Sequence, residues 1–339
     1  MTLSQSEAAQ LASYLEKSVP GFRSMTHIGK FSGGQSNPTY RVDAASGRYV
    51  LRSKPRGKLL QSAHAVDREY RVLAALRQTE VPVPKVLHLC EDPEVFGSIF
   101  YVMEFLHGRV FWDPALPELS VDDRSTAYDD LNRLLAAIHT VDPEAVGLSD
   151  FGRPGNYFER QFARWSKQYR ATETETIDEM EELIGWLHTN MVPDDGRISL
   201  VHGDYRIDNV MFAPDAPRAI AVMDWELSTL GHPFADLAYQ CMLWRWPGHT
   251  VFKGLGTADL STLGIPEEQA YIDLYCRRTG ISGIDNWPFY LAFGLFRLAC
   301  IAQGVRKRVD DGTASNKKAD EIGQLVRPLA NCANDILNS

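Results

Sequence analysis

The chain has 339 residues, of which 44% are hydrophobic and 23% are charged, a composition typical of a globular protein with one large or two coupled domains. Its formal net charge of −9 is uneven, because residues 1–103 carry 13 Lys and Arg against 9 Asp and Glu, whereas the remainder carries 22 against 35. The acidic remainder argues against a nucleic-acid partner, which needs a broad basic face, while the basic first third suits an anionic ligand.

The first 105 residues predict a small mixed lobe. Ser4 and Glu7 have the spacing of a capping box, so we predict a first helix that ends near Lys17. Short β-rich segments follow, separated by turn-forming sequences, and a helical period then returns. The predicted strands are 27–31, 39–42, 49–53, 85–89 and 98–105, and the predicted second helix is 63–77.

The helical period dominates the rest of the chain. A short β-rich block is expected between residues 200 and 224, and the segment 106–108 is a candidate linker. The sequence therefore predicts two domains, residues 1–105 and 106–339. The predicted helices of the second domain are 124–140, 156–170, 176–190, 235–243, 267–279, 288–309 and 317–337.

Neither a targeting segment nor a membrane span is evident. The N-terminal residues lack a basic flank followed by an apolar run, and the richest apolar stretch, FYLAFGLF, ends at Arg297. The five cysteines are scattered and form no C-x-x-C pair, which predicts neither a disulfide framework nor a structural zinc site. We therefore expect a cytoplasmic protein with no membrane partner.

The strongest chemical signal lies in residues 202–209, which contain the pattern H-x-D-x-x-x-x-N. The pattern places Asp204 near Asn209, and Asp224 follows at the end of an apolar strand. A carboxylate that receives a hydroxyl proton, beside an amide oxygen and a second carboxylate, suits phosphoryl transfer with Mg²⁺, which prefers oxygen ligands.

These residues resemble the catalytic and metal-binding motifs of the aminoglycoside phosphotransferase and choline kinase superfamily, the small-molecule relatives of protein kinases. The resemblance covers nearly the whole chain. It implies an α+β, bilobal protein-kinase-like fold, with a small mixed N-lobe built on an antiparallel sheet and a larger, mainly helical C-lobe. It also implies ATP, or alternatively GTP, and Mg²⁺ as cofactors, and a small-molecule hydroxyl as phosphate acceptor.

The same resemblance implies a role for each motif residue. Asp204 corresponds to the catalytic base or hydroxyl-orienting residue, and Arg206 to a contact for the transferred phosphate. Asn209 and Asp224 correspond to the magnesium ligands.

Two further residues of this region are expected to support the catalytic loop. They are His202, within the motif, and Asp236, within the downstream GHPFADL segment. A metal-dependent hydrolase built on His202, Asp204, Asp208, Asp224 and His232 is the competing interpretation. It is disfavoured because the sequence has no H-E-x-x-H motif and no recognised two-metal spacing.

In the first lobe, the resemblance places a phosphate-covering loop at residues 32–37, where Ser36 and Asn37 can donate hydrogen bonds to phosphate oxygens. Arg52 lies on the strand where kinases carry the lysine that holds the α- and β-phosphates. Lys54 lies on the same strand face and is the rival assignment. Glu69 is the helix carboxylate expected to pair with the phosphate-binding cation.

The segment Met103–Leu106 resembles the kinase hinge, so the backbones of Glu104 and Leu106 are expected to bind adenine. A nucleotide-binding module without catalysis is a further alternative. It is disfavoured because the base and both metal ligands are present.

Residues 151–170 are distinctive, and they resemble the kinase-like module at the N-terminus of certain multidomain acyl-CoA dehydrogenases. That branch is associated with phosphorylation of hydroxylated acyl-CoA substrates. Arg160, Arg164 and Lys167 recur at helical spacing and form a basic stripe that suits coenzyme A phosphates, although a solvated helix face is the plainer interpretation. An aminoglycoside or amino-alcohol kinase, with a carboxylate-lined pocket, is the alternative.

Overall fold

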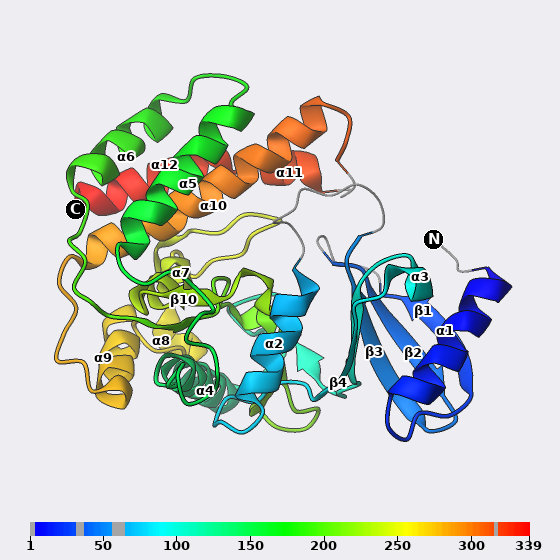
Figure 1. Ribbon diagram of the computed structural model, residues 1–339. Coiled ribbons are helices and arrows are strands. Elements are labelled where there is room, and N and C mark those ends of the chain that lie inside the picture. The colour runs from blue at the N-terminus through cyan, green and yellow to red at the C-terminus, as the bar shows by residue number, and fades with distance from the viewer. Residues whose placement is uncertain (1–3, 32–36, 56–64, 315–317) are drawn as a thin grey trace. The chain divides into compact units, whose positions relative to one another are not determined.

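The computed structural model describes residues 4–31, 37–55, 65–314 and 318–339 (Figure 1). The chain divides into two compact units. The N-terminal unit extends to Gly108 and also contains Ile220–Ser228, and the C-terminal unit contains Arg109–Ala219 and Thr229–Ser339. The segment Ile220–Ser228, which carries Asp224, thus packs with residues that precede it by more than a hundred positions.

The N-terminal unit is built on one antiparallel five-stranded sheet, with the strand order β1-β2-β3-β5-β4. All five predicted strands and both predicted helices of this region are confirmed with small shifts at their ends, and α3 was not predicted. The strands are β1 Met25–Lys30, β2 Thr39–Ala44, β3 Gly47–Ser53, β4 Val86–Cys90 and β5 Phe100–Glu104, and the helices are α1 Gln5–Ser18, α2 Val66–Leu76 and α3 Pro93–Phe96.

The start of α1 is fixed by the predicted capping box. The Ser4 hydroxyl accepts a hydrogen bond from the Glu7 N–H at 3.2 Å, and the Glu7 carboxylate accepts one from the Ser4 N–H at 2.8 Å. Both bonds satisfy N–H groups that have no partner within the helix. The helix therefore begins immediately after Ser4.

Alternation along β3 divides its side chains between two faces of the sheet. Leu51 lies opposite Val102 of β5, and both belong to the apolar core that includes Leu11 and Leu15 of α1. Because successive side chains of a strand point to opposite faces, Arg52 is directed away from this core. The helix α2 packs against β4 and β5, and Arg52 contacts a residue of α2.

The C-terminal unit is mainly helical, and all seven predicted helical segments are present. One correction concerns the last segment, 317–337, which forms two helices. A Cβ at Gly323 would lie only 3.0 Å from the Cβ of Arg306, so the first helix ends where the chain passes close to α10. The helices are α4 Val121–His139, α5 Tyr157–Thr172, α6 Asp178–Thr189, α7 Phe234–Arg245, α8 Leu260–Leu263, α9 Glu268–Thr279, α10 Trp287–Asp310, α11 Ala319–Gly323 and α12 Val326–Leu337.

Short strands of the β-rich block flank the loop that contains residues 202–209. β7 pairs antiparallel with β10, and β6 pairs antiparallel with β8. The short strands β6 and β10 and the helix α8 were not predicted. The strands are β6 Arg109–Val110, β7 Ser199–Val201, β8 Val210–Phe212, β9 Ala219–Val222 and β10 Thr229–Gly231.

The helix α10 forms the centre of the C-terminal unit, where it contacts α5, α6, α7, α11 and α12 (Figure 1). Among the described residues it is the one helix long and apolar enough to cross a membrane, and 83% of its apolar window is buried inside the protein. This burial is typical of a core helix of a globular unit. The cytoplasmic location stays a prediction.

Candidate functional site

The loop after β7 is held by a buried carboxylate at the start of α7. Asp236 accepts hydrogen bonds from the N–H groups of His202, at 2.5 Å, and Gly203, at 2.8 Å. The imidazole of His139 lies 3.4 Å from the same carboxylate, and its other nitrogen is 2.7 Å from the hydroxyl of Tyr275. Asp236 therefore fixes the path of the backbone just before Asp204.

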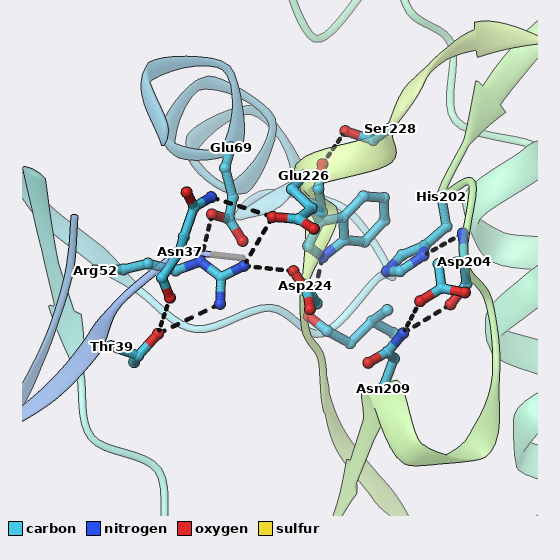
Figure 2. A network of polar contacts seen from close by, with 12 residues as sticks. Asn37, Thr39, Arg52, Glu69, His202, Asp204, Asn209, Asp224, Glu226 and Ser228 are labelled. Atoms are coloured by element: carbon cyan, nitrogen blue, oxygen red, sulfur yellow. Dashed lines mark hydrogen bonds and ion pairs between the residues drawn. The ribbon is translucent and has the colours of Figure 1, made fainter. Parts of the chain in front are cut away.

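Contacts inside the loop orient Asp204 itself (Figure 2). Its N–H donates to the ring of His202 at 3.2 Å. The side-chain amide of Asn209 donates to the Asp204 carbonyl at 2.8 Å and to the Asp204 carboxylate at 3.0 Å. Four of the residues that the sequence singled out, His202, Asp204, Asn209 and Asp236, thus form one network within the C-terminal unit.

The surroundings of Asp204 favour its ionised form. Burial alone would raise the pKa of this carboxyl group, but the positive charges of Arg206 and Arg297 act in the opposite direction. His202 and a hydrogen bond from the Tyr239 hydroxyl add to them, so the pKa of Asp204 lies below its usual value. Asp204 is therefore a partly buried carboxylate that can orient a hydroxyl group or accept its proton at neutral pH.

Arg206 lies against the carboxylates of the same loop. Its Nη2 is 2.7 Å from an oxygen of Asp208, and its Nε is 3.7 Å from an oxygen of Asp204. The guanidinium group also lies over the ring of Phe252, 5.5 Å from the ring centroid. The arginine is therefore ordered beside the base, in a position suited to a negatively charged group.

A second polar cluster lies in the N-terminal unit, around Arg52 (Figure 2). The Nε of Arg52 is 2.7 Å from Glu69, and its Nη2 is 2.5 Å from Asp224 and 3.6 Å from Glu226. The Nη1 donates to the hydroxyl of Thr39 at 3.4 Å. One buried arginine thus meets three carboxylates, two of which come from Ile220–Ser228.

The other predicted phosphate-site residues have different surroundings. Asn37 is almost completely buried, and its amide donates to the Glu226 carboxylate at 3.2 Å. Lys54 pairs with Asp67 at 3.1 Å on a more exposed part of the unit, so Arg52 is the cation that pairs with Glu69. Ser36 lies outside the described residues.

Burial makes Glu69 an unusual carboxylate. Removal from water raises the pKa of Glu69 to about 7, despite the opposing charge of Arg52. The charges of Asp224 and Glu226 raise this pKa further, because a second and a third negative charge disfavour ionisation. The cluster therefore carries more negative charge than Arg52 can balance.

Asp224 and Asn209 offer oxygen ligands of the kind that Mg²⁺ prefers. The backbone of Asp224 is left-handed, with φ 62° and ψ 59°, and one of its carboxylate oxygens contacts Arg52. The amide nitrogen of Asn209 is engaged by Asp204, and its oxygen has no hydrogen-bond partner among the described residues. No group of three His, Cys, Asp or Glu side chains able to hold a metal occurs in the described part of the chain. The available donors thus fit an ion that takes its remaining ligands from phosphates and water.

The predicted hinge follows β5. The Glu104 N–H donates to the Lys85 carbonyl at 2.9 Å, and the Glu104 carboxylate accepts a hydrogen bond from the Lys85 N–H at 2.7 Å. Within the described ranges, the backbone groups of Leu106 have no hydrogen-bond partner. They are therefore available to a ligand.

The predicted basic stripe on α5 is not uniform. Arg160 donates to the carbonyls of Arg153, at 2.7 Å, and Pro154, at 3.3 Å, so it stabilises the segment that precedes the helix. Arg164 is exposed and lies over the ring of Trp165, 5.3 Å from its centroid, and Lys167 is also exposed. The three side chains therefore do not act as one surface.

Sequence reasoning missed four residues of these clusters. Glu226 lies two positions after Asp224, and His139 contacts Asp236 from α4. Tyr239 and Arg297 influence Asp204 from α7 and α10. Glu226 lies two positions after Asp224, and Tyr239 lies two positions after the GHPFADL segment, so spacing could have found both. His139 and Arg297 approach their partners through packing of distant helices.

An antiparallel sheet followed by a mainly helical unit is the architecture of kinase-like phosphotransferases. The structure of a spectinomycin phosphotransferase in complex with ADP and spectinomycin superposes with a TM-score of 0.65 and covers 98% of both chains at 13% identity. A protein from Ralstonia eutropha, provisionally assigned as an aminoglycoside phosphotransferase, is 47% identical, with a TM-score of 0.89 and 98% of both chains covered. The fold is therefore kinase-like, as the sequence predicted.

The chain belongs to the phosphotransferase enzyme family, whose model matches residues 27–271. Mouse acyl-CoA dehydrogenase family member 10 is 47% identical over 90% of the chain, and chicken acyl-CoA dehydrogenase family member 11 is 42% identical over 96%. The chain spans 29% and 42% of the lengths of these two relatives. The predicted resemblance to this branch is thus confirmed.

Proposed function

We propose that the chain transfers the γ-phosphate of ATP to an alcohol hydroxyl of a small molecule, with Mg²⁺ as cofactor. The observation that carries this proposal is Asp204, which is partly buried, is favoured in its ionised form and is oriented by Asn209 and His202. Phosphoryl transfer needs such a group to orient the attacking hydroxyl, and most of the rate then comes from positioning and electrostatics.

Each cluster has a role in this reaction. Asp204 orients the acceptor hydroxyl and receives its proton, and Arg206 stabilises negative charge on the transferred phosphoryl group. Arg52, held by Glu69, binds the α- and β-phosphates with a planar fork that stays charged at every physiological pH. The free backbone groups of Leu106, together with Glu104, bind the adenine.

Mg²⁺ would be held by the oxygens of Asp224 and Asn209. When bound, the ion supplies positive charge that neutralises the phosphates during transfer. The excess of carboxylates around Arg52 supports this assignment, because a divalent cation would offset it.

For the acceptor we propose a hydroxyacyl-CoA type of substrate. The support is the similarity to two proteins named as acyl-CoA dehydrogenases, whose remaining length would provide the next step on the same acyl chain. The competing acceptors are aminoglycosides and amino-alcohols, since the Ralstonia relative carries that provisional assignment.

The test is Mg²⁺-dependent phosphate transfer from ATP, and separately from GTP, to two panels of acceptors. One panel holds 3- and 4-hydroxyacyl-CoAs, and the other holds aminoglycosides and amino-alcohols. We expect transfer to the first panel and a loss of roughly 10²–10⁴-fold in turnover for Asp204→Asn, with ADP affinity unchanged.

The matched control is Asp215→Asn, because Asp215 is an exposed aspartate of the same unit. Its turnover should equal that of the unmodified protein. Unchanged turnover in Asp204→Asn would exclude Asp204 as the catalytic group. Nucleotide binding without transfer to any acceptor would instead indicate a non-catalytic module.

A further inference from the structure

Arg297 is a buried arginine without an acidic partner. It lies on the core helix α10 and is only 9% exposed. Within the described residues, its guanidinium group has no ion pair and no hydrogen bond. Because a buried charge is costly unless it is paired, an anionic ligand in contact with this guanidinium group would stabilise it.

The guanidinium group of Arg297 lies over two aromatic rings. Its central carbon lies 5.6 Å from the ring centroid of Trp165 and 5.0 Å from that of Tyr239. Rings in these positions stabilise a cation, but they do not replace the oxygen acceptors of its N–H groups. The N–H donors of Arg297 are therefore left without an acceptor among the described residues.

The nitrogens of Arg297 are not sealed from solvent. None of these nitrogens has a hydrogen-bond partner among the described residues, and none is fully buried. Each nitrogen therefore retains some accessible surface. By contrast, the indole N–H of Trp165 is fully buried and also lacks an acceptor. The donors of Arg297 thus keep some contact with solvent, in a residue that is 9% exposed.

Other groups make this region positive. Arg164 lies over the same indole ring, so two guanidinium groups flank Trp165. The charges of Arg297, Arg164 and Arg160 all act on the Tyr157 hydroxyl, although burial keeps the pKa of that hydroxyl high, at about 12. Arg297 also acts on Asp204. The positive region is therefore adjacent to the proposed acceptor hydroxyl.

We infer that Arg297 is a specificity-determining residue that binds an anionic oxygen of the phosphate acceptor, either a phosphate of a coenzyme A thioester or the carboxylate of a free hydroxy acid. This inference rests on the proposed function of Asp204. A cationic amino-alcohol would be repelled by the same group. The acceptor is then recognised by two opposite charges, with its hydroxyl at Asp204 and its anion at Arg297.

The test compares acceptors that differ only in their anionic group. They are a 4-hydroxyacyl-CoA, the same acyl chain on pantetheine, which lacks phosphates, and the free 4-hydroxy acid. For Arg297→Met we expect KM to rise about 10- to 100-fold for the anionic acceptor, the size of a lost charged hydrogen bond, and to stay unchanged for the neutral pantetheine thioester. A rise confined to the CoA thioester identifies phosphate, and a rise confined to the free acid identifies carboxylate.

Two further variants control for folding and for general charge. Arg297→Lys retains the charge without the planar fork and should lie between the unmodified protein and Arg297→Met. Arg308→Met removes an exposed arginine from the same helix and should leave every KM unchanged. Melting curves and ADP titrations verify that each variant is folded and binds nucleotide.

Direct binding separates this inference from the proposed reaction. Calorimetric titration of CoA, the free 4-hydroxy acid and pantetheine needs no turnover. Tighter binding of an anionic probe that weakens in Arg297→Met supports the inference even if no acceptor is phosphorylated, in which case only the proposed function fails. Equal binding of anionic and neutral probes, or an equal change in both with Arg297→Met, would overturn it.

Discussion

In the N-terminal unit, one arginine is surrounded by three carboxylates, whereas in the C-terminal unit one carboxylate is surrounded by arginines. Arg52 lies within 4 Å of all three carboxylates of the first cluster. Asp204 is the proposed base of the second, and Arg206 and Arg297 both lower its pKa. Arginines and carboxylates thus meet in both clusters, but the central group is an arginine in the first and a carboxylate in the second.

The difference shows what each cluster lacks. The first has surplus negative charge, which raises the pKa of Glu69 and would be relieved by a divalent cation. In the second, Asp208 pairs with Arg206, so Arg297 is the arginine that has no ion pair among the described residues. The two clusters thus suit ligands of opposite charge, a cation at the first and an anion at Arg297.

The largest expected effect comes from removing Arg52, which contacts all three carboxylates of the acidic cluster. Arg52→Met leaves three carboxylates facing one another, and we expect the free energy of unfolding to fall by about 3–5 kcal/mol. Lys54→Met is the matched control, because its pair with Asp67 is partly exposed and contributes at most about 1 kcal/mol. Urea denaturation measures both variants. Equal losses in the two would contradict the distinction between Arg52 and Lys54.

The next largest effect is a pH dependence of the free energy of unfolding, caused by Glu69. Its pKa is raised from 4.5 to about 7 on folding, so the folded state holds a proton that the unfolded state releases between these values. The contribution of Glu69 to stability is therefore fully present below pH 4.5 and is lost as the pH rises towards 7, by about 1.4 kcal/mol for each unit of pKa shift. Glu69→Gln should remove this slope in urea denaturation at a series of pH values. A slope retained by the variant would assign the titration to another group.

The smallest effect concerns Glu226, the carboxylate farthest from Arg52. Glu226→Gln keeps an oxygen for Asn37 but removes one negative charge, and we expect it to raise stability by less than about 1 kcal/mol without Mg²⁺. The stabilisation produced by MgCl₂ with ADP should be smaller than in the unmodified protein. Melting temperatures with and without these ligands measure both changes, and Glu94→Gln, an exposed change in the same unit, is the control. A larger ligand effect in Glu226→Gln would contradict the role of surplus charge.

Features encoded by neighbouring residues could be predicted from the sequence. The capping box at Ser4, the alternation that separates Leu51 from Arg52, and the spacing between Asp204 and Asn209 all depend on fewer than ten consecutive residues. Short-range geometry fixes such features, so a sequence pattern is sufficient to find them.

Features created by tertiary packing could not be predicted in this way. Arg297 and Tyr239 reach Asp204 from two helices that follow the motif at different distances, and no local pattern distinguishes Arg297 from other arginines on α10. The interruption of the last predicted helix arises because Gly323 lies against Arg306. The surroundings of Asp204 and the interrupted helix both depend on which helices pack together. The spacing of residues in one sequence does not specify that packing.

The left-handed backbone at Asp224 limits which residues can occupy this position. Most L-amino acids lose about 1–2 kcal/mol in that conformation, whereas glycine, asparagine and aspartate adopt it readily. An alanine or valine at position 224 would thus alter the chain path as well as the ligand set. Asparagine and glycine are therefore the replacements that change the ligand set at the least cost to the backbone.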